Sequence, residues 1–357
     1  MKLQVLGLII VLVSLGILTI VFFTDSDRYK PDKKEYKNIE KGINVVFFRN
    51  IEESDIEEVA KTLDRLKDIG VTHISVVLFI YQEGKTSTKI YEDSHQTLPK
   101  DQLVKYIRAA KEKGFTLQLL PLLGVSEGDD DSVGKWNISP ADLSKWFASY
   151  DEEILKYAEI AEVEKVEVFG IGSEMSSLSG ETGRWQNLIE KVRGVYKGQI
   201  LYAANWDDFT EGTFRNELGW LKKVDIIGVD SYFPLKTGEN PSVEELQSVW
   251  TKWEAIFARL RTSDKKIIVS EIGITSTTEH FDEPWRFDID DKEVDLATQE
   301  KYYEAAFRFF QNKVDGIYWW VIDDGLPPQS PLQDKGFSPL GKPAEQVLRK
   351  WYSADYN

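Results

Sequence analysis

Strand-like and helix-like segments alternate along most of this chain, and that alternation limits the folds open to it. Eight short runs of mostly apolar residues carry the strand pattern, at residues 43–48, 71–80, 115–123, 166–171, 200–204, 224–229, 267–269 and 316–321. Stretches with helical periodicity or helix-capping residues follow them. Such runs are typical of strands buried on both faces, which helical crossovers join in parallel. Eight units predict an α/β fold, a (β/α)8 TIM barrel.

A doubly wound open sheet is the alternative arrangement of the same units. Open sheets usually have fewer strands, and their first strand often leads into a glycine-rich turn that binds phosphate. Here the first strand is followed by Phe48-Arg-Asn-Ile-Glu-Glu-Ser54, which contains no glycine. The sequence therefore favours the barrel.

An apolar segment at residues 3–23 precedes the barrel pattern, interrupted only by Gln4, Ser14 and Thr19. About 20 such residues span a bilayer, and no clear small-x-small cleavage motif follows. We expect an uncleaved transmembrane signal anchor in residues 1–24, with a cleaved signal peptide as the alternative. A polar tether in residues 25–40 would join it to a catalytic domain in residues 41–357.

Composition excludes several classes of function. The net charge of -16 leaves no basic excess to neutralise phosphates, so nucleic acid is not an expected partner. The absence of cysteine excludes disulfides, thiolate metal sites and cysteine nucleophiles. Only three histidines are present, and we expect neither a metal nor a cofactor. The run Asp129–Asp131 could bind calcium, although a solvated loop is the favoured interpretation.

Two glutamates stand where buried strands end, in Val166-Glu-Val-Phe-Gly-Ile-Gly-Ser-Glu174 and Lys265-Lys-Ile-Ile-Val-Ser-Glu-Ile-Gly273. The sites of such barrels lie at the carboxyl ends of the strands, and strands four and seven face each other across the ring. Glu174 and Glu271 could then approach the separation of about 5–5.5 Å that retaining glycosidases use. One carboxyl would donate a proton while the other attacks the anomeric carbon.

Further polar and aromatic residues fall at strand ends and are candidates for substrate contact. They are Arg49, Tyr81, Asn205, Trp206, Asp230, Tyr232, Trp319 and Trp320, with Trp136 in the loop before the fourth strand. Polar groups and tryptophans converging on one face suggest a polyol substrate, and Tyr232 could orient the nucleophile. No histidine ends a strand, so a serine–histidine triad would lack its base.

Four motifs resemble one family of enzymes: Gly170-Ile-Gly-Ser-Glu174, Asp230-Ser-Tyr-Phe-Pro234, Val269-Ser-Glu-Ile-Gly273 and Tyr318-Trp-Trp320. Glutamates after strands four and seven resemble clan A of the retaining glycoside hydrolases. Within that clan, residues 41–352 resemble the family 113 β-mannanases. The resemblance implies that Glu174 is the acid/base, that Glu271 is the nucleophile oriented by Tyr232, and that Trp319 or Trp320 floors a sugar subsite.

One position departs from the pattern of the clan. Many members have asparagine before the acid/base, where it contacts the sugar 2-hydroxyl, and this chain has Ser173. Mannose carries that hydroxyl axially, so a different neighbour is compatible with a mannan substrate.

These expectations combine into a membrane-anchored endo-β-1,4-mannanase that acts outside the cell on mannan or glucomannan. The charges around residues 3–23 alone would place the domain in the cytoplasm, and the expected polysaccharide substrate favours export. Alternatives are another retaining β-glycanase or transglycosylase acting on β-glucan, xylan or galactan, and an inactive barrel that binds polysaccharide.

Overall fold

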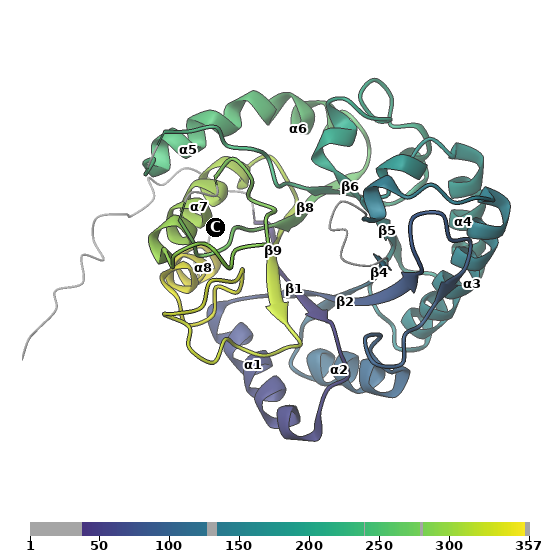
Figure 1. Ribbon diagram of the computed structural model, residues 1–357, viewed down its shortest axis with the longest axis horizontal. Coiled ribbons are helices and arrows are strands. Elements are labelled where there is room, and N and C mark those ends of the chain that lie inside the picture. The colour runs from purple at the N-terminus through teal and green to yellow at the C-terminus, as the bar shows by residue number, and fades with distance from the viewer. Residues whose placement is uncertain (1–37, 127–133, 239, 279–280, 354–357) are drawn as a thin grey trace, which may run out of the picture. The chain divides into compact units, whose positions relative to one another are not determined.

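The computed structural model describes residues 38–126, 134–238, 240–278 and 281–353. Within them, parallel strands close into a barrel surrounded by helices (Figure 1). The barrel strands are β1 (Glu40–Phe47), β2 (His73–Gln82), β4 (Thr116–Val125), β5 (Val168–Ser173), β6 (Gln199–Asn205), β7 (Ile226–Asp230), β8 (Lys266–Ile272) and β9 (Gly316–Asp323). Strand β1 pairs with both β2 and β9, which closes the ring. The predicted (β/α)8 barrel is confirmed, and the open sheet is excluded.

A short extra strand extends the sheet beside β2. Strand β3 (Ile90–Tyr91) pairs antiparallel with the last two residues of β2, Tyr81 opposite Tyr91 and Gln82 opposite Ile90. It therefore builds up the rim at the carboxyl end of the barrel. The sequence pattern did not indicate it, because two residues are too few to show alternation.

Helices outside the barrel carry the chain between strands. They are α1 (Ile56–Ile69), α2 (Lys100–Glu112), α3 (Leu143–Val163), α4 (Thr182–Val195), α5 (Val243–Trp250), α6 (Glu254–Leu260), α7 (Leu296–Phe310) and α8 (Pro343–Ser353). Short 3-10 turns lie at Glu53–Asp55, Lys135–Asn137, Ser176–Leu178, Trp206–Phe209, Gly219–Lys223 and Thr251–Trp253. The last of these turns separates α5 from α6.

Side-chain caps begin three of the helices. Asp142 accepts from the backbone of Ser144 and Lys145 at the start of α3, and Asp295 caps α7 in the same way. Ser242 and Glu245 form a reciprocal capping box at α5. Ser54 and Glu57 have the sequence spacing of a capping box, which predicts one here. None forms, because a 3-10 turn precedes α1.

Alternate side chains of the strands point into the barrel and fill it. A lower layer consists of Val168, Leu201, Ile226, Ile268 and Tyr318. An upper layer consists of Val46, Val77, Leu120, Leu122, Tyr232, Val321 and Phe337, with Phe79, Trp206 and Trp320 partly buried against it. The barrel is thus a packed core, and a ligand can reach only its end.

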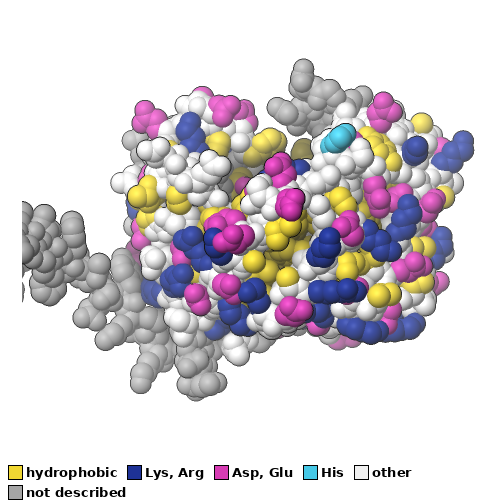
Figure 2. Space-filling view, turned by 90° about the horizontal axis from the view of Figure 1, so that it is seen from below, with side chains coloured by type: hydrophobic (Ala, Val, Ile, Leu, Met, Phe, Trp, Pro, Cys, Tyr) yellow, Lys and Arg dark blue, Asp and Glu magenta, His cyan; other side chains and the backbone are white. Residues whose placement is uncertain are grey.

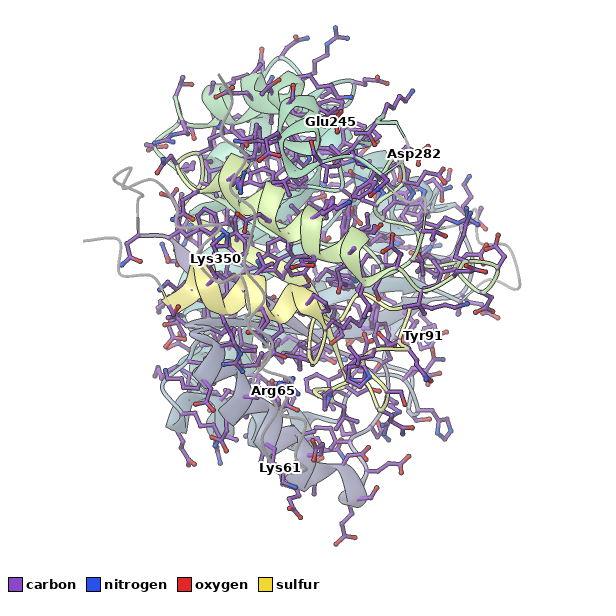
Figure 3. All side chains as sticks on the ribbon, turned by 90° about the vertical axis from the view of Figure 1, so that its left-hand side faces the viewer. Lys61, Arg65, Tyr91, Glu245, Asp282 and Lys350 are labelled. Atoms are coloured by element: carbon purple, nitrogen blue, oxygen red, sulfur yellow. The ribbon has the colours of Figure 1, made fainter. Side chains whose placement is uncertain are left out.

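Outward side chains of the strands pack beneath the helices. Helices α7 and α8 lie side by side (Figure 3), and Glu304 of α7 is buried between them. Its carboxylate accepts from Lys350 Nζ at 3.0 Å and from Trp351 Nε1 at 2.9 Å.

On one face of the molecule, acidic and basic side chains are interspersed (Figure 2), so the acidic excess is not gathered into a patch there.

The predicted anchor, residues 1–24, lies outside the described residues, as does the tether up to residue 37. Among the residues that the structure does describe, no helix is long and apolar enough to cross a membrane. The barrel lies within one compact unit, Tyr36–Asn357. The division into anchor, tether and catalytic domain stays a prediction.

Candidate active site

Glu174 directly follows β5 in a backbone conformation that side chains seldom adopt. Its φ is 52°, in the left-handed region, and its N–H donates to the Ala203 carbonyl of β6 at 2.9 Å. A left-handed non-glycine residue costs of order 1 kcal/mol, and such residues cluster at functional sites. The Glu174 side chain is 14% exposed, so the carboxyl is accessible without lying freely in solvent.

Glu271 lies within β8 and is almost fully buried. Its Oε2 accepts a hydrogen bond from Tyr232 Oη at 3.3 Å, whereas Oε1 is buried and has no hydrogen-bond partner among the described residues. Burial raises the pKa of the Glu271 carboxyl to about 7, the charge of Glu174 adds to the rise, and the Lys135 ammonium and the Tyr232 hydrogen bond oppose it. The two glutamates therefore lie close enough for one charge to affect the other.

Asp230, the last residue of β7, is fully buried beneath the glutamates. Its Oδ1 accepts from Ser270 Oγ at 2.6 Å and its Oδ2 from Ser173 Oγ at 3.1 Å. Ser173 precedes Glu174 and Ser270 precedes Glu271. The Asp230 carboxyl is therefore bonded to the residue before each glutamate and joins the two strands at that level. Burial, reinforced by the charges of Glu271 and Glu174, raises the Asp230 pKa well above its usual range.

Lys135 contacts the same group of residues and was not among the expected site residues. It begins the 3-10 turn Lys135–Asn137 in the loop before α3, and its side chain is 13% exposed. Its Nζ lies 3.1 Å from Glu174 Oε2 and 3.2 Å from Ser173 Oγ. The loop shows no periodicity that would place Lys135 in the barrel mouth, and the sequence therefore offers no signal for it.

The two adjacent tryptophans of β9 occupy different environments. Trp319 is fully buried and stacks on Tyr303 of α7, with ring centroids 3.7 Å apart. Trp320 is half-buried against the upper layer of the barrel, and a cis peptide bond joins it to Val321. Trp320 is thus the tryptophan that faces the mouth, and Trp319 is a core residue beneath a helix.

The remaining expected site residues lie at the rim. Asn205 ends β6 opposite Asp230 and is half-buried, and the half-buried Trp206 packs edge-on against Trp253 with ring centroids 5.0 Å apart. Arg49 forms ion pairs with Asp55 at 2.8 Å and Asp324 at 3.0 Å.

Two aromatic residues complete the rim. Trp136 is 42% exposed beside Lys135. Tyr81 is buried and stacks with Phe79.

The family to which this chain belongs follows from its sequence. A model of Glycoside Hydrolase Family 113 matches residues 48–342. This chain belongs to glycoside hydrolase family 113. It is therefore a glycoside hydrolase, and the resemblance seen in the four motifs is confirmed. No sequence among the curated proteins matches it.

Solved structures of family 113 enzymes share the fold. A GH113 β-1,4-mannanase in complex has 22% identity and a TM-score of 0.76, covering 89% of this chain and 100% of that one. The GH113 β-mannanase AaManA from Alicyclobacillus acidocaldarius, in complex with ManMIm, has 21% identity and a TM-score of 0.72, over 89% and 98%. The endo-β-1,4-mannanase from Thermotoga petrophila has 14% identity and a TM-score of 0.53, over 90% and 77%.

An acidic hollow lies next to Glu174 in this family 113 barrel. It has a volume of about 250 Å³ and is lined by Ser176, Asp207, Asp208, Glu211, Gly212 and Thr213. Burial, the charge of Asp207 and the charge of Glu174 raise the pKa of Asp208 to about 7. The charge of Glu174 thus raises the pKa of Glu271 in the barrel mouth and that of Asp208 in the hollow.

Metal ligands are not grouped in the described part of the family 113 barrel. No cluster of three or more His, Cys, Asp or Glu side chains there could hold a metal ion. The run Asp129–Asp131, considered above as a calcium site, lies outside the described residues.

Proposed function

We propose that this chain is a retaining endo-β-1,4-mannanase that cleaves mannan or glucomannan by double displacement. The observation that carries the proposal is the pairing of Glu174 and Glu271 at the ends of β5 and β8, with Tyr232 bonded to Glu271. The solved family 113 neighbours, which are β-mannanases by name, support mannan as the substrate.

In the first step, a Glu271 oxygen bonds to the anomeric carbon while Glu174 gives its proton to the leaving oxygen. The glycosidic bond breaks, and an ester joins the sugar to Glu271. Glu271 Oε1, which has no partner among the described residues, is the oxygen left for the attack, because Oε2 is bonded to Tyr232.

In the second step, Glu174 takes a proton from water as the water attacks the anomeric carbon, and the ester to Glu271 breaks. Two inversions at one carbon restore the original configuration. Both steps need one protonated and one ionised carboxyl in turn. Burial alone favours the protonated form of Glu271, whereas the Lys135 ammonium and the Tyr232 hydrogen bond favour the ionised form that attacks.

The stereochemistry of the product tests this mechanism. NMR of the first-formed product from mannan oligosaccharides should show the β-anomer, and an inverted anomer would rule out double displacement. A panel of mannan, glucomannan, β-glucan, xylan and galactan tests the substrate. Cleavage of another polysaccharide alone would support a different retaining glycanase, and binding without cleavage would support an inactive barrel.

The roles of the two glutamates can be separated by chemical rescue. Glu271→Ala should abolish turnover, and azide should then give a glycosyl azide of inverted configuration. Glu174→Ala should lose most activity on mannan and far less in the first step on an aryl mannoside with an acidic phenol. Azide should trap its intermediate with retained configuration. Glu57→Ala, on the surface of α1, is the control. Exchanged azide products would reverse the two roles.

We also propose that residues 1–24 anchor the enzyme with its barrel outside the cell. The apolar length of residues 3–23 supports an anchor, and a polysaccharide substrate supports export. Protease added to intact cells should cut the barrel from the membrane fraction. Protection from the protease would place the barrel inside, and release of a shortened soluble form would indicate a cleaved signal.

A further inference from the structure

Lys135 reaches the acid/base from a loop rather than from a barrel strand. Its ammonium contacts Glu174 Oε2 at 3.1 Å and Ser173 Oγ at 3.2 Å, and Ser173 in turn donates to Asp230. A long lysine side chain loses rotamer freedom when it is held in this way, which other interactions must offset. The contacts with Glu174 and Ser173 offset this loss of entropy, since the Lys135 side chain is only 13% exposed.

The carboxyls around Lys135 come from several elements. Glu174 follows β5, Asp230 ends β7 and Glu271 lies in β8. Burial lowers the pKa of Lys135, but the charges of these three carboxyls outweigh burial, and the net pKa is raised. Glu174 itself also faces Tyr232, Asp207 and Asp208. Lys135 is therefore charged. Its ammonium offsets part of the negative charge of the surrounding carboxyls.

We propose that Lys135 is a positioning residue of this site, whose ammonium holds the Glu174 carboxyl in place and stabilises the carboxylate that forms when Glu174 gives its proton to the leaving oxygen. The inference rests on the proposed function. No additional reactant is needed, since the proton moves from Glu174 to the glycosidic oxygen as the bond from carbon to oxygen breaks. The negative charge that remains on Glu174 then lies against Lys135.

The role depends on the leaving group in a way that a merely structural role does not. An alkoxide leaving group of a polysaccharide needs a strong acid, and an acidic phenol needs little help. A cation that stabilises the Glu174 carboxylate makes Glu174 a stronger acid. Loss of Lys135 should consequently slow the first step on mannan and spare the same step on a dinitrophenyl mannoside.

The experiment compares Lys135→Met and Lys135→Gln, which lack the charge, with Lys135→Arg, which keeps it. On mannan, kcat/KM should fall about 100-fold in the uncharged variants, within the range for general acid catalysis. On the dinitrophenyl substrate it should fall less than about threefold, and arginine should restore part of the loss. Lys191→Met, which removes an ion pair with Asp151 on the outside of the barrel, is the matched control.

The pH profile gives a second, independent measurement. Removal of a cation raises the pKa of nearby carboxyls, so both limbs of the bell should move to higher pH in Lys135→Met and stay in place in Lys135→Arg. Equal losses on both substrates, or an unmoved profile in a folded Lys135→Met or Lys135→Gln, would overturn the proposal.

A titration without substrate separates the two proposals. NMR of enzyme with ¹³C-labelled glutamate carboxyls follows Glu174 and Glu271 directly, with Glu174→Gln and Glu271→Gln for assignment. If Lys135→Met shifts both titrations upward but unmodified enzyme cleaves no mannan, the contact is supported and the proposed substrate is wrong. If mannan is cleaved and the titrations do not move, the role of Lys135 alone is wrong.

Discussion

Tyr232 and Glu271 are joined by a hydrogen bond of 3.3 Å from the phenol oxygen to Oε2. Tyr232 lies just after β7, and Glu271 is the residue before the last of β8. Burial raises the pKa of Tyr232 well above its usual range, so its hydroxyl stays protonated and acts as the donor. In the proposed mechanism, the bond leaves Oε1 as the attacking oxygen. It also favours the ionised form of Glu271, which is the form that attacks in that mechanism.

Tyr232→Phe removes this bond without removing the ring from the upper layer of the barrel. The pKa of Glu271 should rise, because the hydrogen bond lowers it, and the acidic limb of the pH profile should move to higher pH. At pH 6, kcat/KM should fall about tenfold, as expected for a bond worth about 1.5 kcal/mol to a charged group. An acidic limb that stays in place would separate Tyr232 from the ionisation of Glu271. Tyr91→Phe, on the rim strand β3, is the control.

Glu271→Gln should make the barrel more stable at neutral pH. The pKa of Glu271 is about 7 when folded and about 4.5 when unfolded, so its contribution to stability is fully present below pH 4.5 and lost as pH rises through 7. Glutamine does not titrate, so the variant does not lose this stability as pH rises. The free energy of unfolding of the variant minus that of the unmodified protein should therefore increase by up to about 3 kcal/mol between pH 4 and pH 8.

Denaturant unfolding at the two pH values measures this difference. The charge of Glu271 also raises the Asp230 pKa, so its removal in Glu271→Gln should lower that pKa and add to the increase. Glu57→Gln is the control, because the pKa of that exposed carboxyl is lowered by Lys61 and should produce no such increase. A difference that falls with pH would mean that Glu271 is not destabilised by burial.

Replacement of the two adjacent tryptophans should have opposite consequences. Trp319→Ala should cost about 3–5 kcal/mol of stability, since it leaves a cavity beneath α7 where Trp319 stacks on Tyr303. Trp320→Ala should cost less stability and should raise KM for mannan about tenfold through a lost sugar contact, within the range for one aromatic group. Unfolding curves and initial rates distinguish the two, and a reversed pattern would exchange their assignments.

The backbone at Glu174 predicts a difference between two inactive variants. Glycine adopts a φ of 52° without strain, and alanine does not. Glu174→Gly should therefore be as stable as Glu174→Ala or more stable, by about 1 kcal/mol, although glycine normally weakens a folded chain through its unfolded state. Equal unfolding midpoints after correction for that entropy would show that position 174 is relaxed in solution.

The strand ends were the most predictable part of the molecule. Glu174 and Glu271 could be located from sequence because a carboxylate after a buried strand has few structural uses. The period of two within a strand also requires Trp319 and Trp320 to face opposite sides. It does not say which one faces inward, because both neighbours, Tyr318 and Val321, are apolar.

Residues outside regular elements were harder to predict. Lys135 comes from an irregular loop, and its contact with Glu174 depends on tertiary geometry rather than on pattern. Arg49 was expected near the substrate, but its ion pairs with Asp55 and Asp324 depend on how the chain turns after β1 and β9. The capping box at Ser54 does not form either, because residues 53–55 form a 3-10 turn and α1 begins only after it.

The left-handed backbone at Glu174 bears on how such a barrel can change in evolution. The proposed mechanism requires an acidic side chain at position 174, where glycine would adopt the backbone without strain, and an ionisable carboxyl at the buried position 271, where we predict an amide to be more stable. Once selection for hydrolysis is relaxed, both substitutions become favourable to folding, while Trp320 and the rim are left intact. A descendant that binds polysaccharide without cleaving it would therefore gain folding stability, and a return to catalysis would lose it.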